Sequence, residues 1–240
     1  MSAAARIVPG MDVLLIPGLW LDASSWDDVS PALSRAGHTV HALTMPGLGA
    51  PAAESADVGL ADWVDEVVRV IDEAAGPVAL VGHSGGGNVA WAAAAARPDR
   101  VARVIFVDTV PPPEGADISE FDAVDGVVPF PGWDFFDAED VADLDADTRA
   151  RTAPLTRSVP VRVPSDPVHL ADEARYGIPV TILSGGMDEA ALRGVLSRWG
   201  AFAAEFDAIA DTEVVRLGTG HWPQFSDPER LSAALVAALR

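Results

Sequence analysis

The sequence predicts an α/β fold with a doubly wound, mostly parallel sheet of about six to seven strands. Two observations carry this prediction. Apolar runs of strand length alternate with segments of helical periodicity, and the runs are continuous, as is typical of parallel strands covered on both faces. The predicted strands are Val13–Ile16, Thr39–Leu43, Val78–Val81, Val104–Val107, Val180–Leu183 and Val214–Leu217.

Helical periodicity recurs between and after these runs. Apolar residues fall on one stripe from Leu60 to Ile71 and on another from Leu192 to Phe202. A last helix is expected after Asp227 and Pro228, with its apolar residues ending at Leu239. Each stripe would cover one part of the sheet.

Composition limits the classes of function. A length of 240 residues suits one domain, residues 1–240, with a full core. The chain has no cysteine, which excludes disulfides and cysteine metal sites. A net charge of −20 argues against nucleic-acid and membrane partners, because phosphate binding needs basic patches. The first residues contain no apolar stretch of signal-peptide length, so we expect a cytoplasmic protein.

One segment, residues 111–177, interrupts the alternation before the penultimate strand. It opens with three prolines, holds nine of the 19 prolines, and carries 15 acidic residues against five arginines. Its scattered aromatic residues favour a helical lid or cap inserted within the domain. A solvated, partly disordered excursion is the alternative, which the aromatic content disfavours.

The most specific motif follows the third strand. Gly82, Ser84 and Gly86 form G-x-S-x-G between an apolar strand and a helix. This nucleophile elbow places a serine hydroxyl on a sharp turn above the sheet, and the glycines leave room for the turn to close. Ser84 is therefore the candidate nucleophile, which needs a base to remove its proton.

The candidate base and acid lie beyond later strand ends, where open α/β sheets place their sites. His221 follows the last strand and is the candidate base. Asp188 follows the penultimate strand and is the preferred acid, which would accept the second N–H of the histidine. Asp108, at the end of the neighbouring strand, is the alternative acid, and Glu189 is a more remote one.

An oxyanion hole needs two backbone N–H groups. We expect one from Gly85, directly after the serine, and one from Leu19 in the loop after the first strand, with Trp20 as its substitute. His83 is expected to pack against the sheet. Trp20, Trp133 and Trp222 are candidates for the substrate pocket, although each could equally belong to the core.

With these motifs, the chain resembles the α/β-hydrolase fold superfamily, in particular its small single-domain serine esterases, which are related to plant esterases and hydroxynitrile lyases. The resemblance implies a catalytic Ser84, Asp188 and His221, with no cofactor and no metal. Two departures are a nearly absent antiparallel strand pair before the first core strand and Pro17 in place of a common histidine. The matching stretches are Leu14–Trp26, Val78–Trp91, Val104–Pro113, Val180–Glu189 and Gly218–Pro228.

The sequence therefore predicts a cofactor-free serine hydrolase that cleaves a small, largely neutral carboxylic ester through an acyl-Ser84 intermediate, as a monomer or homodimer. One alternative is a carbon–carbon bond hydrolase or a lyase that uses the same triad, because Trp222 follows the histidine as in hydrolases of ring-fission products. A second alternative is a ligand-binding homologue without catalysis, for which the discriminating feature would be a damaged triad.

Overall fold

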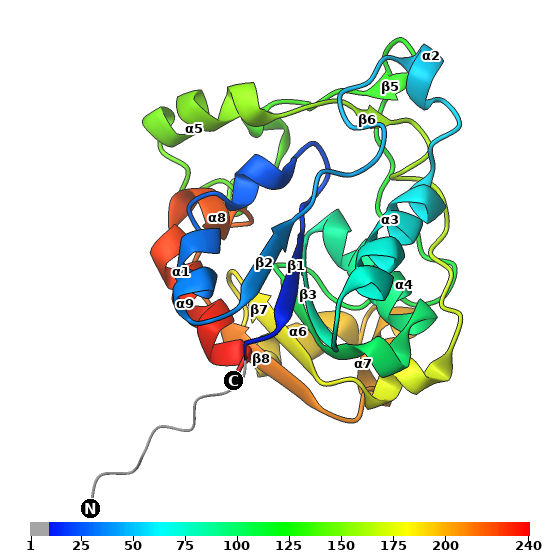
Figure 1. Cartoon of the computed structure of the whole chain (residues 1–240). Helices are drawn as coiled ribbons and strands as arrows, with labels where there is room; N and C mark the ends of the chain where they lie inside the picture. The colour runs from blue at the N-terminus through cyan, green and yellow to red at the C-terminus, as the bar shows by residue number, and fades with distance from the viewer. Residues whose placement is uncertain (1–9) are drawn as a thin grey trace, which may run out of the picture.

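The computed structural model describes residues 10–240, and its centre is a six-stranded sheet in which every neighbouring pair is parallel (Figure 1). The strand order is β2-β1-β3-β4-β7-β8. All six predicted strands are present, with ends that differ by at most a few residues. The strands are β1 (Asp12–Ile16), β2 (Thr39–Ala42), β3 (Val78–His83), β4 (Val101–Val107), β7 (Val180–Ser184) and β8 (Thr212–Arg216).

The apolar runs are continuous because both faces of the sheet are covered. In β1, Leu14 and Ile16 belong to one buried cluster, whereas Val13 and Leu15 belong to another on the opposite face. Side chains alternate along a strand, so each strand supplies both clusters. All six residues of β3 are buried, which places the elbow motif at the end of a rigid central strand.

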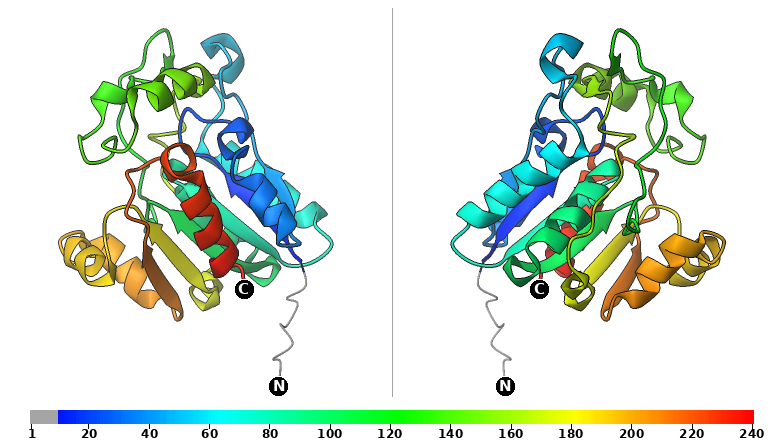
Figure 2. Two further views of the ribbon diagram at one scale, coloured as in Figure 1. Left: turned by 90° about the vertical axis from the view of Figure 1, so that its left-hand side faces the viewer. Right: turned by 90° about the vertical axis from the view of Figure 1, so that its right-hand side faces the viewer.

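Helices cover the two faces of the sheet (Figure 2). Residues of α1 (Ser30–Arg35) and α9 (Pro228–Ala238) pack on the face of Val13 and Leu15. The opposite face is covered by α3 (Leu60–Glu73), α4 (Gly85–Ala96), α6 (Glu189–Leu196) and α7 (Gly200–Ala208). Shorter elements are η1 (Ala23–Trp26), α2 (Ala52–Ser55), η2 (Pro98–Arg100) and α8 (Pro223–Ser226).

The stripe predicted from Leu192 to Phe202 is divided between two helices. The backbone leaves the helical conformation at Trp199, where ψ is 70°, and α7 then begins at Gly200. Both halves still bury apolar side chains in the same cluster, which explains why the sequence shows one stripe. No helix among residues 10–240 is both long enough and apolar enough to cross a membrane.

The insertion, residues 111–177, lies between β4 and β7, and most of it sits beyond the carboxyl ends of the strands (Figures 1 and 2). Its last part runs back beside α4, where the carbonyl oxygen of Tyr176 accepts a hydrogen bond from the N–H of Ala210, just before β8. The insertion contains one α-helix, several 3-10 turns and one two-stranded antiparallel ladder, joined by irregular chain. Two of its aromatic side chains, Trp133 and Phe136, pack against Trp222 of the main domain. Its elements are β5 (Val127–Val128), η3 (Trp133–Phe135), α5 (Ala146–Thr152), η4 (Ala153–Leu155), β6 (Val159–Pro160) and η5 (Glu173–Gly177).

Candidate active site

Ser84 lies on a strained turn between β3 and α4. Its φ of 50° and ψ of −127° fall outside the regions that L residues ordinarily occupy. The glycines around it are required by close backbone approach. A Cβ on Gly82 would lie 2.5 Å from the carbonyl oxygen of Gly86, and one on Gly86 would collide with the carbonyl oxygen of Pro17. The serine hydroxyl is thereby held at the end of the central strand.

His221 lies in the loop after β8 and pairs with Asp108, which follows β4. The distance from His221 Nδ1 to Asp108 Oδ2 is 2.7 Å. Asp108 has a φ of 48°, and its second oxygen accepts a hydrogen bond of 2.7 Å from the N–H of Gly185. Burial alone would raise the pKa of Asp108, but the hydrogen bond and charge of His221, together with the Gly185 N–H, outweigh it and lower the pKa.

The preference for Asp188 as the partner of His221 is corrected by this geometry. The Asp188 side chain is exposed and caps α6, where its Oδ1 accepts a 2.9 Å hydrogen bond from the N–H of Ala191. Glu189 pairs with Arg193. Both aspartates follow neighbouring strands, but Asp108 turns inward directly after its strand, whereas Asp188 starts a helix, a common role for aspartate. The alternative acid, Asp108, is the one that the structure pairs with His221.

His83, next to the serine, supports the backbone of the candidate base. It is fully buried, its Nε2 lies 2.8 Å from the carbonyl oxygen of His221, and its Nδ1 lies 3.3 Å from Nε2 of Gln224. Burial and the nearby His221 lower the pKa of His83 to about 3. A neutral ring donates from Nε2 to the carbonyl and accepts at Nδ1. His83 is therefore a specific support and not merely a packing residue.

The insertion holds the same loop from the other side. The carbonyl oxygen of Asp140 accepts a 2.8 Å hydrogen bond from the N–H of His221, and Oδ2 of Asp143 accepts one of 2.8 Å from the N–H of Gly220. A Cβ on Gly220 would collide with the carbonyl oxygen of Asp140. Sequence reasoning missed these residues, because they share no motif with the histidine loop and lie about 80 residues away from it.

The loop after β1 lies over the elbow. A Cβ on Gly18 would be 3.1 Å from Cβ of Ser84, and one on Gly85 would be 3.2 Å from Cγ of Leu19. Leu19 and Trp20 occupy the centre of a turn closed by a bond from the N–H of Leu21 to the oxygen of Gly18. Within residues 10–240, the N–H groups of Leu19 and Gly85 donate no hydrogen bond, which leaves both free for a ligand oxygen.

Ser84 and His221 border one small cavity of about 120 Å³. Two of the three predicted pocket tryptophans, Trp20 and Trp222, line it. Trp133 does not: it is buried behind Trp222, with ring centroids 5.0 Å apart, and its Nε1 donates to the backbone of the insertion. Further walls come from Leu19, Ile118, Phe121 and Phe136.

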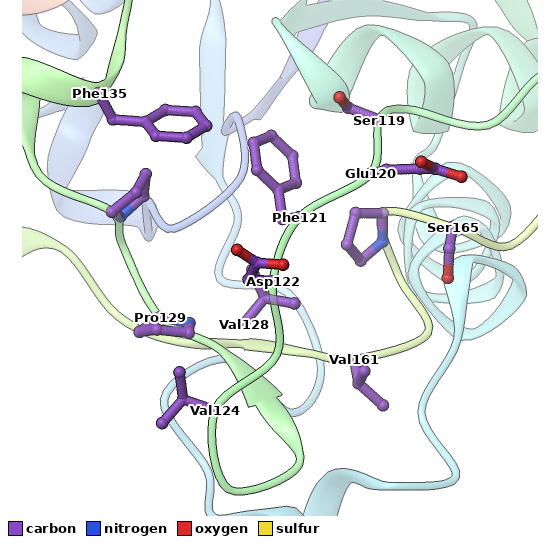
Figure 3. A pocket seen from close by; sticks show the side chains of 12 residues that line it. Ser119, Glu120, Phe121, Asp122, Val124, Val128, Pro129, Phe135, Val161 and Ser165 are labelled. Atoms are coloured by element: carbon purple, nitrogen blue, oxygen red, sulfur yellow. The ribbon is translucent and has the colours of Figure 1, made fainter.

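A larger groove of about 730 Å³ adjoins this cavity, and Figure 3 shows the side chains that line the groove. Ser119 and Phe121 line both the cavity and the groove. All of the residues that line the groove belong to the insertion. Most of the walls are apolar, from Val124, Val128, Pro129, Pro131, Val161 and Pro164.

Comparison with known proteins agrees with this architecture. The sequence matches the model of the alpha/beta hydrolase family over residues 13–234. It is 39% identical over 116 residues to RutD of Variovorax paradoxus, named a carbamate hydrolase, a match that covers 48% of this chain and 44% of the relative. It is 34% identical over 102 residues to the pimeloyl-[acyl-carrier protein] methyl ester esterase of Aliivibrio fischeri, covering 42% and 38%. The matches therefore span less than half the length of these curated relatives.

The whole fold is similar to solved structures. An extracellular α/β-hydrolase from a Paenibacillus species superposes with a TM-score of 0.73 at 19% identity, over 95% of this chain and 98% of that one. Its description reports structural and functional homology to tobacco salicylic acid binding protein 2. At this identity the likeness concerns the fold alone. The family match over almost the entire described chain establishes that the protein belongs to the α/β-hydrolase family.

Proposed function

We propose that the protein is a cofactor-free serine hydrolase that cleaves a small, largely neutral carboxylic ester through an acyl-Ser84 intermediate. The observation that carries the proposal is the 2.7 Å bond between His221 and Asp108 beside a strained Ser84 at one cavity. A serine, a half-buried carboxylate and a histidine, in this order along the chain, are the parts that nucleophilic acyl transfer needs. The names of the curated relatives, which are hydrolases and esterases, support it.

In this mechanism, His221 Nε2 removes the proton of Ser84 as its Oγ attacks the ester carbonyl. Asp108 accepts the N–H of Nδ1, which keeps the Nε2 lone pair toward the serine and stabilises the imidazolium that forms. The imidazolium then protonates the leaving alcohol. In the second half, His221 activates water, which releases the acid from Ser84.

The negative oxygen of the tetrahedral intermediate would be held by the N–H groups of Leu19 and Gly85. Both are free of other acceptors within residues 10–240, and the two residues lie next to each other over the elbow. Removing one such donor in comparable sites costs roughly 3 kcal/mol of transition-state stabilisation. Trp20, which follows Leu19 in the same turn, is the substitute donor.

The charge and size of the cavity favour a neutral reacting group. No arginine of the described chain lines either the catalytic cavity or the adjoining groove. A hydrolase of ring-fission products would need a cation for the carboxylate of its substrate, so this observation favours the ester over the carbon–carbon alternative. We also propose that the insertion acts as a cap of the one hydrolase domain, since it supplies Ile118, Phe121 and Phe136 to the cavity.

The test is the intact mass of the protein after treatment with a small fluorophosphonate. We expect one adduct on the parent chain and on the Ser119→Ala variant, which changes another serine of the same cavity. The Ser84→Ala variant should form none. A parent chain that is folded but unlabelled would contradict the proposal and favour a ligand-binding homologue without catalysis.

A lyase that uses the same triad without an acyl-enzyme is distinguished by trapping. The parent chain should show an acyl mass on Ser84 when an ester reaction is quenched with acid within one turnover. Ester turnover without any acyl adduct under burst conditions would contradict the covalent route.

A further inference from the structure

The groove beside the catalytic cavity carries a specific combination of groups. Two aromatic rings, Phe121 and Phe135, lie side by side in its wall, with centroids 6.1 Å apart and planes inclined by 50° (Figure 3). Phe121 also lines the catalytic cavity, where it makes an edge-to-face contact with the ring of Trp20 at a centroid distance of 4.8 Å. Phe135 is 60% exposed although it is a large apolar side chain. The aromatic pair thus leads from the solvent to the candidate nucleophile.

The only charged side chains that line the groove are Glu120 and Asp122. Both are exposed, and neither has an ion pair or a side-chain hydrogen bond within residues 10–240. Figure 3 shows Asp122 near the ring of Phe121, whereas Glu120 extends to the other side of the same chain, near Ser165. The groove therefore combines apolar walls and aromatic faces with two uncompensated negative charges.

Basic groups of the neighbourhood are engaged elsewhere. Arg162, next to the lining residue Val161, pairs with Asp166 at 3.2 Å and donates to the backbone of Asp57. Arg157 lies 3.9 Å from Asp22 and bonds the backbone of its own segment. Neither lines the groove. An anionic group placed there would meet repulsion without any compensating cation.

From these observations we infer that the groove binds the remote end of the ester substrate and favours an alkylammonium or arylalkylammonium group there. The inference rests on the proposed function for the neutral ester at the reacting end, and it changes the overall charge of the substrate proposed there from largely neutral to cationic. A quaternary ammonium is attracted by aromatic faces and by carboxylates and tolerates apolar walls, which matches the three properties of the groove. The reaction is the ester hydrolysis proposed above, in which water and the ester give an acid and an alcohol. The cation belongs to the part of the substrate that lies in the groove, outside the catalytic cavity.

The first test compares esters of equal shape and different charge. Esters of one short acid are prepared with choline and with its neutral isostere 3,3-dimethylbutanol, and with homologues of both that are two and four methylenes longer. At low ionic strength we expect the best cationic ester to exceed its neutral isostere about tenfold in kcat/KM. A matched ester that ends in a carboxylate should be the poorest substrate, and added salt should reduce the differences.

The control separates the groove from the overall charge of −20. The groove variant Glu120→Gln/Asp122→Asn should lose most of the preference for the cation. The matched variant Asp147→Asn/Glu173→Gln removes two exposed acidic charges from the insertion outside the groove and should keep the preference. An equal loss in both variants, or a preference for the neutral isostere in the parent chain, would overturn the inference.

A binding measurement keeps the two proposals distinguishable. Calorimetric titration with benzyltrimethylammonium should give a Kd about tenfold lower for the parent chain and for Ser84→Ala than for the groove variant. Loss of this difference with esterase activity intact would refute the groove inference alone. Cation binding that depends on the groove in a chain that neither cleaves esters nor labels at Ser84 would refute the proposed function and leave the groove assignment standing.

Discussion

Replacing Asp108 by asparagine tests the geometry of the candidate site most directly. Both carboxylate oxygens are engaged, one with His221 Nδ1 and one with the N–H of Gly185, each at 2.7 Å. In Asp108→Asn the amide oxygen can keep only one of these bonds. If the amide oxygen accepts the N–H of Gly185, the amide NH₂ faces Nδ1 of His221, which must then accept a hydrogen bond. The imidazole is forced into the tautomer with its proton on Nε2, and this form cannot accept the proton of Ser84.

We therefore expect Asp108→Asn to lower kcat by about 1,000- to 10,000-fold, equivalent to about 4–5.5 kcal/mol of transition-state stabilisation. The matched control is Asp188→Asn, which removes the same charge at the next strand end. Asparagine caps helices about as well as aspartate, so this variant should keep kcat within about twofold. Asp188→Ala should lose the cap of α6, costing about 1 kcal/mol and about 2–4 °C in Tm, with little change in kcat.

The assay is steady-state hydrolysis of a series of p-nitrophenyl esters, with far-UV circular dichroism melts of each variant. A folded Asp108→Asn protein with near-parent kcat would refute the reasoning. So would a loss of 100-fold or more in Asp188→Asn at unchanged Tm, which would return the role of the acid to Asp188.

Three further predictions follow from the contacts around the site. Because burial lowers the pKa of His83 to about 3, the unfolded chain binds a proton below pH 6.5 that the folded chain excludes. The free energy of unfolding should therefore fall from pH 6.5 toward pH 3, by up to about 1.4 kcal/mol per pH unit from this group. Urea titrations at several pH values should show that the unfolding free energy of His83→Gln depends less steeply on pH than that of the parent chain. Asp143→Ala removes the acceptor of the Gly220 N–H and should lower kcat about tenfold with a nearly unchanged KM. The control Asp145→Ala only removes the cap of α5 and should leave kcat unchanged. Equal effects of the two variants on kcat would contradict a role for Asp143 in holding the histidine loop. Gly86→Ala should destabilise the fold by about 1–3 kcal/mol in chemical denaturation, since its Cβ would meet the carbonyl oxygens of Ile16 and Pro17, which belong to fixed backbone; an unchanged unfolding midpoint would contradict that close approach.

The central architecture could be predicted from sequence because its causes are local. A strand buried on both faces is apolar at most of its positions, so β1, β3, β4 and β7 are visible as nearly continuous apolar runs. The elbow is visible for a similar reason, since the approach of Gly82 to Gly86 admits no side chain. The proximity of Ser84 and His221 followed from the rule that parallel strand ends meet at one edge.

The remaining parts of the site depend on contacts between distant segments. Asp108 and Asp188 both follow strands of the right order, and chain order alone could not decide between them. A local signal did exist: Asp188 precedes Glu189 and a run of good helix formers, which is typical of an N-cap. The bonds of His83 and Asp143 to the histidine loop join residues 138 and 77 positions apart and involve backbone groups that carry no sequence signature.

The insertion connects the two parts of the site. Its residues Asp140 and Asp143 hold the loop of His221, while Ser119 and Phe121 line both the catalytic cavity and the groove. Ordering of a substrate in the groove would thus act on the same segment that fixes the candidate base. Binding energy from the remote end of a substrate can then be used to order the reacting end, so that truncated esters should lose kcat as well as affinity. An insertion confined to covering the cavity would affect KM alone, and the ester series of increasing length separates these two behaviours.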